Sequence, residues 1–291
     1  MISILIPTHD YTCYKLVYDL HEQAERLGVQ YEIIVAEDGS RDQVSVIANH
    51  KITDLSNCKH VVFKQNLGPA AIRNELAEIA QYEWILFLDS DAFVDKNDFL
   101  QTYIDNKDQA EVIIGGLHHQ DINHNPNRSL RFKYEKAADK HRSASERKKN
   151  PYSHLSTFNL FVHRPMFMQI QFNKQCHEYG YEDALFGVEL KQRNISILHI
   201  DNPLMHKGLD TNEVFIKKTE TALRTLKSLK GKMNGHSHVE NMYNKFKQIH
   251  LAWVLCLFHK VFNRAILCNL KSANPSLCLF SIYKLGYYAC L

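Results

Sequence analysis

The sequence lacks several features that would place it in a specialised class of protein. Its 291 residues include seven cysteines but no CxxC pair, which argues against a zinc ribbon and a disulfide framework and fits a reducing compartment. The net charge is only +3, so nucleic acid is not an expected partner. The longest unbroken apolar stretch, 251–258, is far shorter than the roughly 20 residues that a membrane span needs. A hydrophobic fraction of 45% is ordinary for a globular chain.

The first residues also lack two common signals. The apolar stretch Ile2–Ile6 is too short for a signal peptide and is predicted to be a strand, so we expect a cytoplasmic protein. Pro7-Thr8-His9-Asp10 follows it, where a nucleotidyltransferase would normally carry a glycine-rich phosphate loop.

Strands and helices are predicted to alternate along the first 117 residues. The expected strands are 2–6, 31–36, 60–64, 84–88 and 111–117. The expected helices are 14–27, 44–49, 70–80 and 99–106. This alternation indicates an α/β fold with a mixed, mainly parallel sheet flanked by helices. Such sheets bind ligands at the carboxyl ends of their strands, where the polar clusters of this chain fall.

The rest of the chain is less regular. Residues 118–150 are polar and contain the basic run Lys136–Lys149, which predicts a solvated loop or helix face, with a flexible flap near a site as the alternative. Beyond it the expected strands are 156–162 and 195–200, and the expected helices are 184–193 and 212–232.

Asp89 and Asp91 flank one serine directly after the apolar run Trp84–Leu88. Residues two apart on a strand point the same way, and two adjacent like charges are stable when a cation lies between them. Carboxylate oxygens suit Mg²⁺ or Mn²⁺, which take further ligands from phosphates and water. The motif therefore predicts a metal–diphosphate site, and an ordinary turn is the alternative.

Two other residues have properties that suit a nucleotide site. Asp38 follows a predicted strand in Glu-Asp-Gly-Ser and could accept a hydrogen bond from a nucleobase. Arg73 lies one turn inside a predicted helix, where its guanidinium could reach a base or a diphosphate. Taken singly, the first is a common turn residue and the second a common partner in surface ion pairs.

Two further groups suit catalysis and metal binding. The pair Glu182-Asp183 opens a predicted helix, where a carboxylate could serve as a general base or simply cap the helix. His206 follows a predicted strand and could bind a metal, although a lone histidine is more often structural.

The order of these groups resembles that of the inverting family 2 glycosyltransferases. The matching groups, over about residues 1–209, are Pro7-Thr8, Glu37-Asp38-Gly39-Ser40, Asn-x-Gly-x-x-x-x-Arg-Asn at 66–74, Asp89-Ser90-Asp91, Glu182-Asp183 and His206. The resemblance implies a GT-A domain at 1–210. Its nucleotide-binding half would be 1–117 and its acceptor-side half 118–210. The remaining residues, 211–291, carry no signature of this family and are expected to form a helical extension.

The resemblance also implies roles for the nucleotide-binding residues. Pro7 and Thr8 would line the nucleotide pocket, and Asp38 would contact the base, usually uracil. Arg73 would lie at the nucleotide, and Asp89 would contact the ribose or a metal-bound water.

The remaining roles concern the metal and the chemistry. Asp91 would bind Mn²⁺ or Mg²⁺, with His206 as a further ligand, and Asp183 would be the catalytic base. The sugar or the acceptor is expected to contact Gly116, Asn159 and Glu182.

The resemblance thus predicts an inverting, metal-dependent glycosyltransferase. It would move a sugar from a nucleotide-diphosphate donor, UDP-linked by expectation, to a glycan or lipid-linked acceptor in surface polysaccharide biosynthesis. Ile72 replaces a small residue of the family pattern beside Arg73, and the absence of Gln-x-x-Arg-Trp argues against a processive polymerase. A nucleotidyltransferase and a non-catalytic partner protein with this fold are the alternatives.

The last stretch, Ile249–Leu291, differs from the rest because it is apolar, aromatic and basic, with no acidic residue. This composition suits a helix lying in an anionic membrane surface, on the inner face of the cytoplasmic membrane. A helix pair that covers the sheet domain or forms an oligomer interface is the alternative.

Overall fold

The computed structural model describes residues 1–119, 125–229, 231–233 and 235–291, and these form two compact units. The first unit comprises Met1–His118, His141–His177 and Glu182–Gly208; the second comprises His119–Lys140, Glu178–Tyr181 and Leu209–Leu291. The predicted domain boundary after residue 210 stays a prediction. The contacts divide the chain after Gly208 and assign 119–140 to the second unit.

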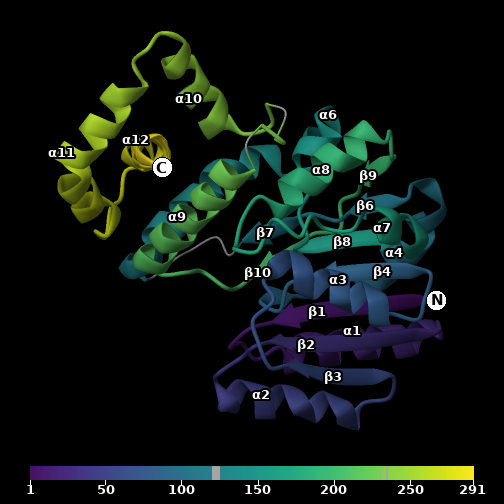
Figure 1. The fold of residues 1–291 in the computed structure, drawn as a ribbon. Coiled ribbons are helices and arrows are strands. Elements are labelled where there is room, and N and C mark those ends of the chain that lie inside the picture. Colours follow the sequence, from purple (N-terminus) through teal and green to yellow (C-terminus); the bar gives the residue numbers. More distant parts are fainter. Residues whose placement is uncertain (120–124, 230, 234) are drawn as a thin grey trace. The chain divides into compact units, whose positions relative to one another are not determined.

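The first unit is built on a seven-stranded sheet with the order β3-β2-β1-β4-β8-β6-β9 (Figure 1). Its strands are β1 (Ile2–Thr8), β2 (Tyr31–Asp38), β3 (Cys58–Phe63), β4 (Trp84–Leu88), β6 (Val112–Ile114), β8 (Asn159–His163) and β9 (Ile197–His199). β1, β2, β3 and β4 are parallel to one another, and β8 runs antiparallel to both β4 and β6. The prediction of a mixed, mainly parallel sheet is confirmed.

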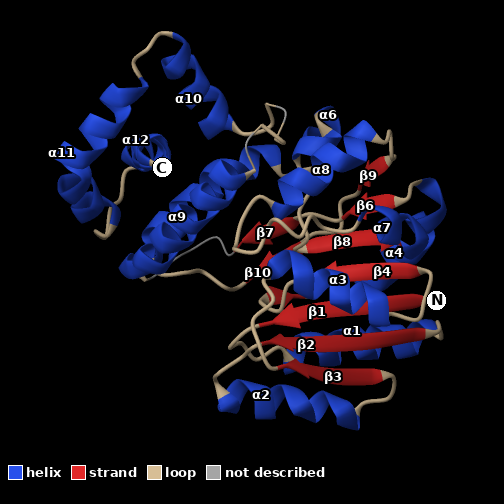
Figure 2. Cartoon of the chain, in the orientation of Figure 1, coloured by secondary structure: helices blue, strands red, loops and turns tan. Residues whose placement is uncertain are grey.

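Helices cover both faces of this sheet (Figure 2). Those of the first unit are α1 (Tyr14–Leu27), α2 (Gln43–His50), α3 (Pro69–Ile79), α4 (Phe99–Asn106), α6 (Ala144–Lys149), α7 (Arg164–Ile170) and α8 (Glu182–Gln192). Side chains alternate along β1, so Ile4 and Ile6 join a core cluster with Leu20 of α1 and Phe99 of α4. On β4, Phe87 contacts the ring of Phe167 of α7. Each face therefore has its own apolar layer.

A smaller sheet with the order β5-β10-β7 combines β5 (Ala92–Phe93), β10 (Leu204–His206) and β7 (Leu117–His119). The expected single strand 111–117 is wrong, because the chain breaks into β6 and β7 at Gly115 and Gly116. A Cβ on Gly115 would lie 2.4 Å from the Tyr103 hydroxyl and 2.5 Å from the Asn159 amide nitrogen. The backbone passes too close to other groups there for a regular strand with side chains.

The prediction of a solvated surface for the basic run Lys136–Lys149 is wrong at Arg147. This side chain is buried, and its guanidinium donates to the carbonyls of Gly115 (3.2 Å) and Ile200 (2.7 Å). Its Nε also donates to His199 Nδ1 at 3.1 Å. Burial lowers the pKa of His199 to about 4, with nearby Arg147 adding to the effect. Arg147 therefore fastens the segment around α6 to the ends of β6 and β9.

The second unit is helical, as expected for the C-terminal extension. It contains α5 (Ser129–Ala138), α9 (Asn212–Ser228), α10 (His238–Gln248), α11 (Ala252–Leu270) and α12 (Leu277–Cys290). Phe215 of α9 packs against Phe280 of α12, with ring centroids 5.3 Å apart, in a cluster that includes Leu130, Ile266 and Leu270. α5 lies in the stretch predicted to be a solvated loop or helix face; it is a helix, but its Leu130 is fully buried in this cluster.

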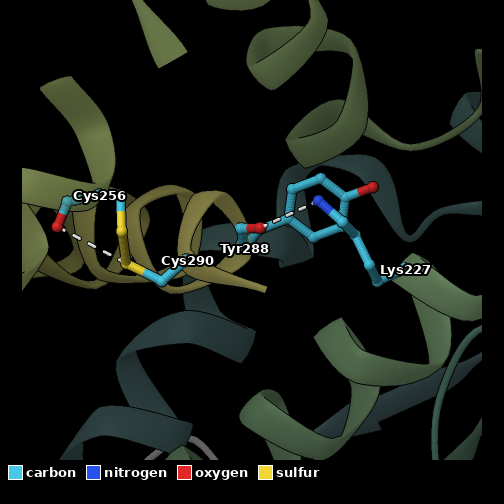
Figure 3. The surroundings of a disulfide bond; sticks show 4 residues. All are labelled: Lys227, Cys256, Tyr288 and Cys290. Carbon is cyan, nitrogen blue, oxygen red and sulfur yellow. Dashed lines mark hydrogen bonds between the residues drawn. A yellow bond between two sulfur atoms is a disulfide. The ribbon is translucent and has the colours of Figure 1, made fainter. Parts of the chain in front are cut away.

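A disulfide joins Cys256 of α11 to Cys290 of α12, so the prediction of no disulfide framework is wrong at this pair (Figure 3). The two cysteines are 34 residues apart and meet only because the helices pack antiparallel. In the same view the Lys227 ammonium lies over the Tyr288 ring, 4.6 Å from its centroid.

Among the described helices no single one is long and apolar enough to cross a bilayer; α10 and α11 together pass by length and composition, but bend by 116° at their junction.

Candidate active site

The polar residues at the carboxyl ends of β1 and β2 lie where nucleotide contacts were predicted. Thr8 ends β1, is buried, and donates through its hydroxyl to the Tyr11 carbonyl at 2.9 Å. Pro7 precedes it and pairs with Ala36 of β2. Asp38 ends β2 and accepts from the backbone N–H groups of Leu67 (2.6 Å) and Gly68 (3.2 Å). Asp38 thus holds the loop that leads into α3.

Glu37 is a residue whose role the sequence did not indicate. Its carboxylate is fully buried and accepts from Asn49 Nδ2 at 2.8 Å and from the Ser40 hydroxyl, and it pairs with His60 Nε2 at 3.2 Å. Burial alone would raise the pKa of Glu37, but the hydrogen bonds from His60, Asn49 and Ser40 outweigh it and leave the pKa lowered. Glu37 therefore ties β3 and α2 to the end of β2, beside Asp38.

Asp89 and Asp91 lie in a turn beyond β4 rather than on the strand, so they do not share one face as expected. The turn is closed by a hydrogen bond from the Ala92 N–H to the Asp89 carbonyl at 3.1 Å. Each carboxylate has its own cationic or ionisable partner: Asp89 has Arg73, and Asp91 has His206. The two carboxylates therefore belong to two different side-chain pairs.

Arg73 is buried in the first half of α3 and interacts electrostatically with Asp89 and with the pair Glu182-Asp183. Its Nη2 lies 2.5 Å from Asp89 Oδ1, and its Nη1 donates to the Pro69 carbonyl at 2.9 Å. Its Nε is covered and has no hydrogen-bond partner among the described residues. Burial would lower the pKa of Arg73, but the charges of Asp89, Asp183 and Glu182 raise it. Arg73 is therefore the cation around which these carboxylates gather.

Asp183 lies in the first turn of α8, where the helix dipole favours negative charge. Its Oδ2 accepts from the Thr157 N–H at 3.1 Å, while its Oδ1 is covered and has no hydrogen-bond partner in the described part of the chain. Asp183 as a whole is half-buried, but its Oδ1 is covered, so the carboxylate is poorly solvated. Burial raises the pKa of Asp183, and the opposing effects of Arg73 and the Thr157 N–H are smaller.

Asp91 and His206 meet because β5 and β10 pair antiparallel, with His206 opposite Ala92. Their Oδ2 and Nε2 atoms lie 3.0 Å apart. Gly208 passes so close that a Cβ there would lie 1.9 Å from Asp91 Oδ2. A carboxylate and an imidazole at this distance, with room kept by a glycine, fit a divalent cation such as Mn²⁺ or Mg²⁺.

The three residues predicted to contact the sugar or the acceptor are packed against, or hydrogen-bonded to, other residues of the protein. Asn159 is buried, donates to the carbonyls of Gly116 and Asn202 (each 2.9 Å), and accepts from the Tyr103 hydroxyl at 2.5 Å. Gly116 has φ +90°, and a Cβ there would strike the Arg147 guanidinium. Glu182 is buried beside Asp183. A ligand contact by any of the three stays a prediction.

A family of known sequences matches the part of the chain that contains most of these residues. The model of the family described as Glycosyl transferase family 2 matches residues 3–171. The chain belongs to this family. The match covers the sheet from β1 through β8 and both carboxylates of the Asp-x-Asp turn, so the predicted family resemblance is confirmed.

Two curated relatives match shorter segments. An uncharacterized glycosyltransferase from Haemophilus influenzae is 34% identical over 117 residues, which cover 39% of this chain and 45% of that protein. A poly(ribitol-phosphate) beta-glucosyltransferase from Bacillus spizizenii is 35% identical over 91 residues, covering 30% and 14%. The chain thus spans less than half the length of either relative.

Solved structures share the fold of this family 2 chain at low sequence identity. TarS 1–349 from S. aureus has a TM-score of 0.54 at 16% identity and covers 99% of this chain and 89% of that one. The mannosyltransferase PcManGT from Pyrobaculum calidifontis, solved with GDP-Man and Mn²⁺, has a TM-score of 0.54 at 12% identity, with coverage of 99% and 84%. TarS 1–349 solved with UDP has a TM-score of 0.51 at 18% identity, with coverage of 79% and 65%. The predicted GT-A fold is confirmed.

Proposed function

We propose that this family 2 glycosyltransferase is an inverting enzyme that uses a divalent metal and a nucleotide-diphosphate sugar. The observation that carries the proposal is the covered Oδ1 of Asp183, which has no hydrogen-bond donor among the described residues and belongs to a carboxyl group whose pKa is raised by burial. A carboxylate with its basicity raised by burial is suited to take a proton near neutral pH. No part of this assignment requires a second nucleophile in the protein.

The reaction is a single displacement at the anomeric carbon. An acceptor hydroxyl forms the new C–O bond, its proton goes to the Asp183 carboxylate, and the bond between the anomeric carbon and the diphosphate oxygen breaks with its electron pair on the leaving nucleoside diphosphate. Attack from the face opposite the leaving group inverts the configuration. Asp91 and His206 would hold the metal, and bound Mn²⁺ or Mg²⁺ supplies positive charge for the diphosphate.

The donor is proposed to be UDP-linked, with Pro7, Thr8, Asp38, Arg73 and Asp89 on the nucleotide side. TarS has been solved with UDP and with UDP-GlcNAc, which supports this choice, while the GDP-Man of PcManGT makes a guanosine donor the comparison to run. The acceptor is proposed to be a glycan or a lipid-linked chain in surface polysaccharide biosynthesis. The relative named as a poly(ribitol-phosphate) beta-glucosyltransferase supports a polymeric acceptor. We also propose peripheral contact with a membrane, where such acceptors reside.

The test is a donor screen with Mn²⁺ or Mg²⁺. The full chain is mixed with UDP-glucose, UDP-GlcNAc or GDP-mannose, and release of nucleoside diphosphate and thermal stabilisation are both measured. A bound donor at about 100 times its Kd should stabilise the fold by about 2.7 kcal/mol. Release of pyrophosphate with transfer of the nucleotide would instead identify a nucleotidyltransferase, and binding without turnover under any condition would favour a non-catalytic role. The anomeric configuration of the product, read by NMR, decides inversion.

A further inference from the structure

Helix α11 presents two very different faces. His259, Ile266 and Leu270 are buried against the rest of the second unit, and the ring of His259 lies 5.2 Å from that of Tyr283 on α12. The opposite face is apolar and open. Its large exposed side chains, with the two that precede the helix, are Ile249, Leu251, Trp253, Val254, Leu257, Phe258, Val261 and Phe262.

The spacing of these side chains makes a continuous stripe. Trp253, Leu257 and Val261 recur every four residues, and their exposed fractions are 63%, 52% and 63%. Residues four apart lie on the same side of a helix, so the stripe runs along more than two turns. A contiguous exposed apolar face of this kind marks an interaction surface, whereas scattered exposed apolar residues do not.

The charged side chains of the segment that carries the stripe have one sign only. After Glu240 the chain carries six lysine and arginine residues and no aspartate or glutamate, so the preceding 240 residues have 29 basic against 32 acidic side chains. A protein with a net charge of +3 therefore places all of its positive excess in its last 51 residues. Lys260 and Arg264 are exposed one turn apart on α11 itself.

The apolar stripe and the basic residues beside it indicate which kind of partner binds this surface. A second copy would bring the same positive charges against each other, which like-charge repulsion opposes. Among the described helices no single one is both long and apolar enough to cross a bilayer, and the α10–α11 pair that passes together is bent by 116°. An apolar stripe edged by lysine and arginine matches the interface of a bilayer that contains anionic lipids.

We propose that the exposed face of α11, with Ile249 and Leu251, lies in the surface of an anionic lipid bilayer. The disulfide between Cys256 and Cys290 fastens α11 to α12 and leaves the stripe facing outward. The proposal rests on the membrane contact included in the proposed function, but not on any catalytic residue. Failure of vesicle binding and failure of sugar transfer are therefore separate results.

The main experiment is co-sedimentation of the full chain with vesicles made of equal parts phosphatidylglycerol and phosphatidylcholine. The variant Leu257→Glu/Val261→Glu should bind at least about 100-fold more weakly, because two buried apolar contacts are replaced by charges. The matched control is Val44→Glu/Ile47→Glu, which changes two apolar residues on α2 of the first unit that are at least as exposed as Leu257 and Val261. Equal binding by both variants, or equal loss in both, overturns the proposal.

The charge component is tested separately. Lys260→Gln/Arg264→Gln should weaken binding by about fivefold for each positive charge removed, and the effect should shrink at high salt. Binding that is equally tight to pure phosphatidylcholine overturns the anionic requirement. A concentration-dependent dimer that disappears in Leu257→Glu/Val261→Glu, without vesicle binding by the unmodified chain, would assign the stripe to a second copy and also overturn it.

Trp253 gives a readout that needs no disruptive variant. The chain has two tryptophans, and Trp253 is 63% exposed while Trp84 stacks on Phe161 inside the sheet. Adding anionic vesicles should shift the emission to shorter wavelength, and Trp253→Phe should remove the shift while keeping most of the binding. An unchanged spectrum with the unmodified chain bound to vesicles contradicts burial of this face.

Discussion

Replacing Asp183 by asparagine should make the folded protein more stable while abolishing transfer. The covered carboxylate has one oxygen without a donor among the described residues, and burial raises its pKa in spite of Arg73 and the Thr157 N–H. The folded state therefore holds this proton more tightly than the unfolded chain does. Keeping the group ionised at neutral pH costs folding free energy, and asparagine removes that cost.

The sign and the size follow from linkage. Below the unfolded pKa of about 3.9 both states are protonated and the cost is absent; it grows as the pH rises toward the folded pKa and is constant above it. Each unit by which the folded pKa exceeds the unfolded value corresponds to about 1.4 kcal/mol. That amount raises Tm by about 2–4 °C in a domain of 150–250 residues.

The assay is urea and thermal unfolding of metal-free protein from pH 4 to pH 8, beside nucleoside diphosphate release with donor and metal. Asp54→Asn is the control, since Asp54 is exposed and lies 16 positions from Asp38, the nearest of the predicted site residues. The gain from Asp183→Asn should widen with pH and then level off, and donor binding should persist. A stability difference independent of pH would refute the buried-carboxylate argument, and near-normal turnover would refute the role as base.

Three other changes test the rest of the site. Arg73→Gln breaks the pair with Asp89 and should lower the free energy of unfolding in urea by roughly 2–4 kcal/mol, a figure discounted for the partial exposure of Asp89. Because Arg73 lowers the pKa of Asp183, its loss should also move the acidic limb of the pH–rate profile to higher pH. An unmoved limb contradicts this electrostatic link between Arg73 and Asp183. Gly208→Ala should displace the Asp91 carboxylate and raise the metal concentration for half-maximal activity by about 10-fold or more, with little change in Tm. Arg147→Ala should lower the unfolding free energy by about 3 kcal/mol or more in urea titration, since buried carbonyls lose their donor; a loss under 1 kcal/mol speaks against that role.

The sequence predicts the elements of the fold well where apolar runs are bounded by turns. Tyr14–Leu27 and Trp84–Leu88 have the bounds expected, because helical spacing and a compact apolar run each leave one interpretation. The reversal of β8 between β4 and β6 was not predictable, since strand direction depends on the path of long connections. The break at Gly115 depends on side chains 12 and 44 residues away, Tyr103 and Asn159.

The residues of the candidate site can be named from the sequence, where their roles stay predictions, but the contacts between them cannot. Arg73 and Asp89 were both assigned to the nucleotide, and nothing in their spacing indicates that they bind each other. The closeness of Asp91 and His206 arises from pairing of β5 with β10, two short strands more than a hundred residues apart. The Glu37 network and the Cys256–Cys290 bond likewise depend on tertiary packing alone.

The hydrogen bonds from the backbone to the Asp38 carboxylate affect the free energy of binding a nucleotide. A carboxylate has about four lone-pair positions, and the Leu67 and Gly68 N–H groups use two of them. The hydrogen bonds of the described residues leave the other two positions unused, on a side chain that can no longer rotate freely. The entropy of ordering both this carboxylate and the loop before α3 is thus lost during folding, so a base that donates to Asp38 meets a rigid, prepared acceptor and binds with a smaller entropic loss of its own.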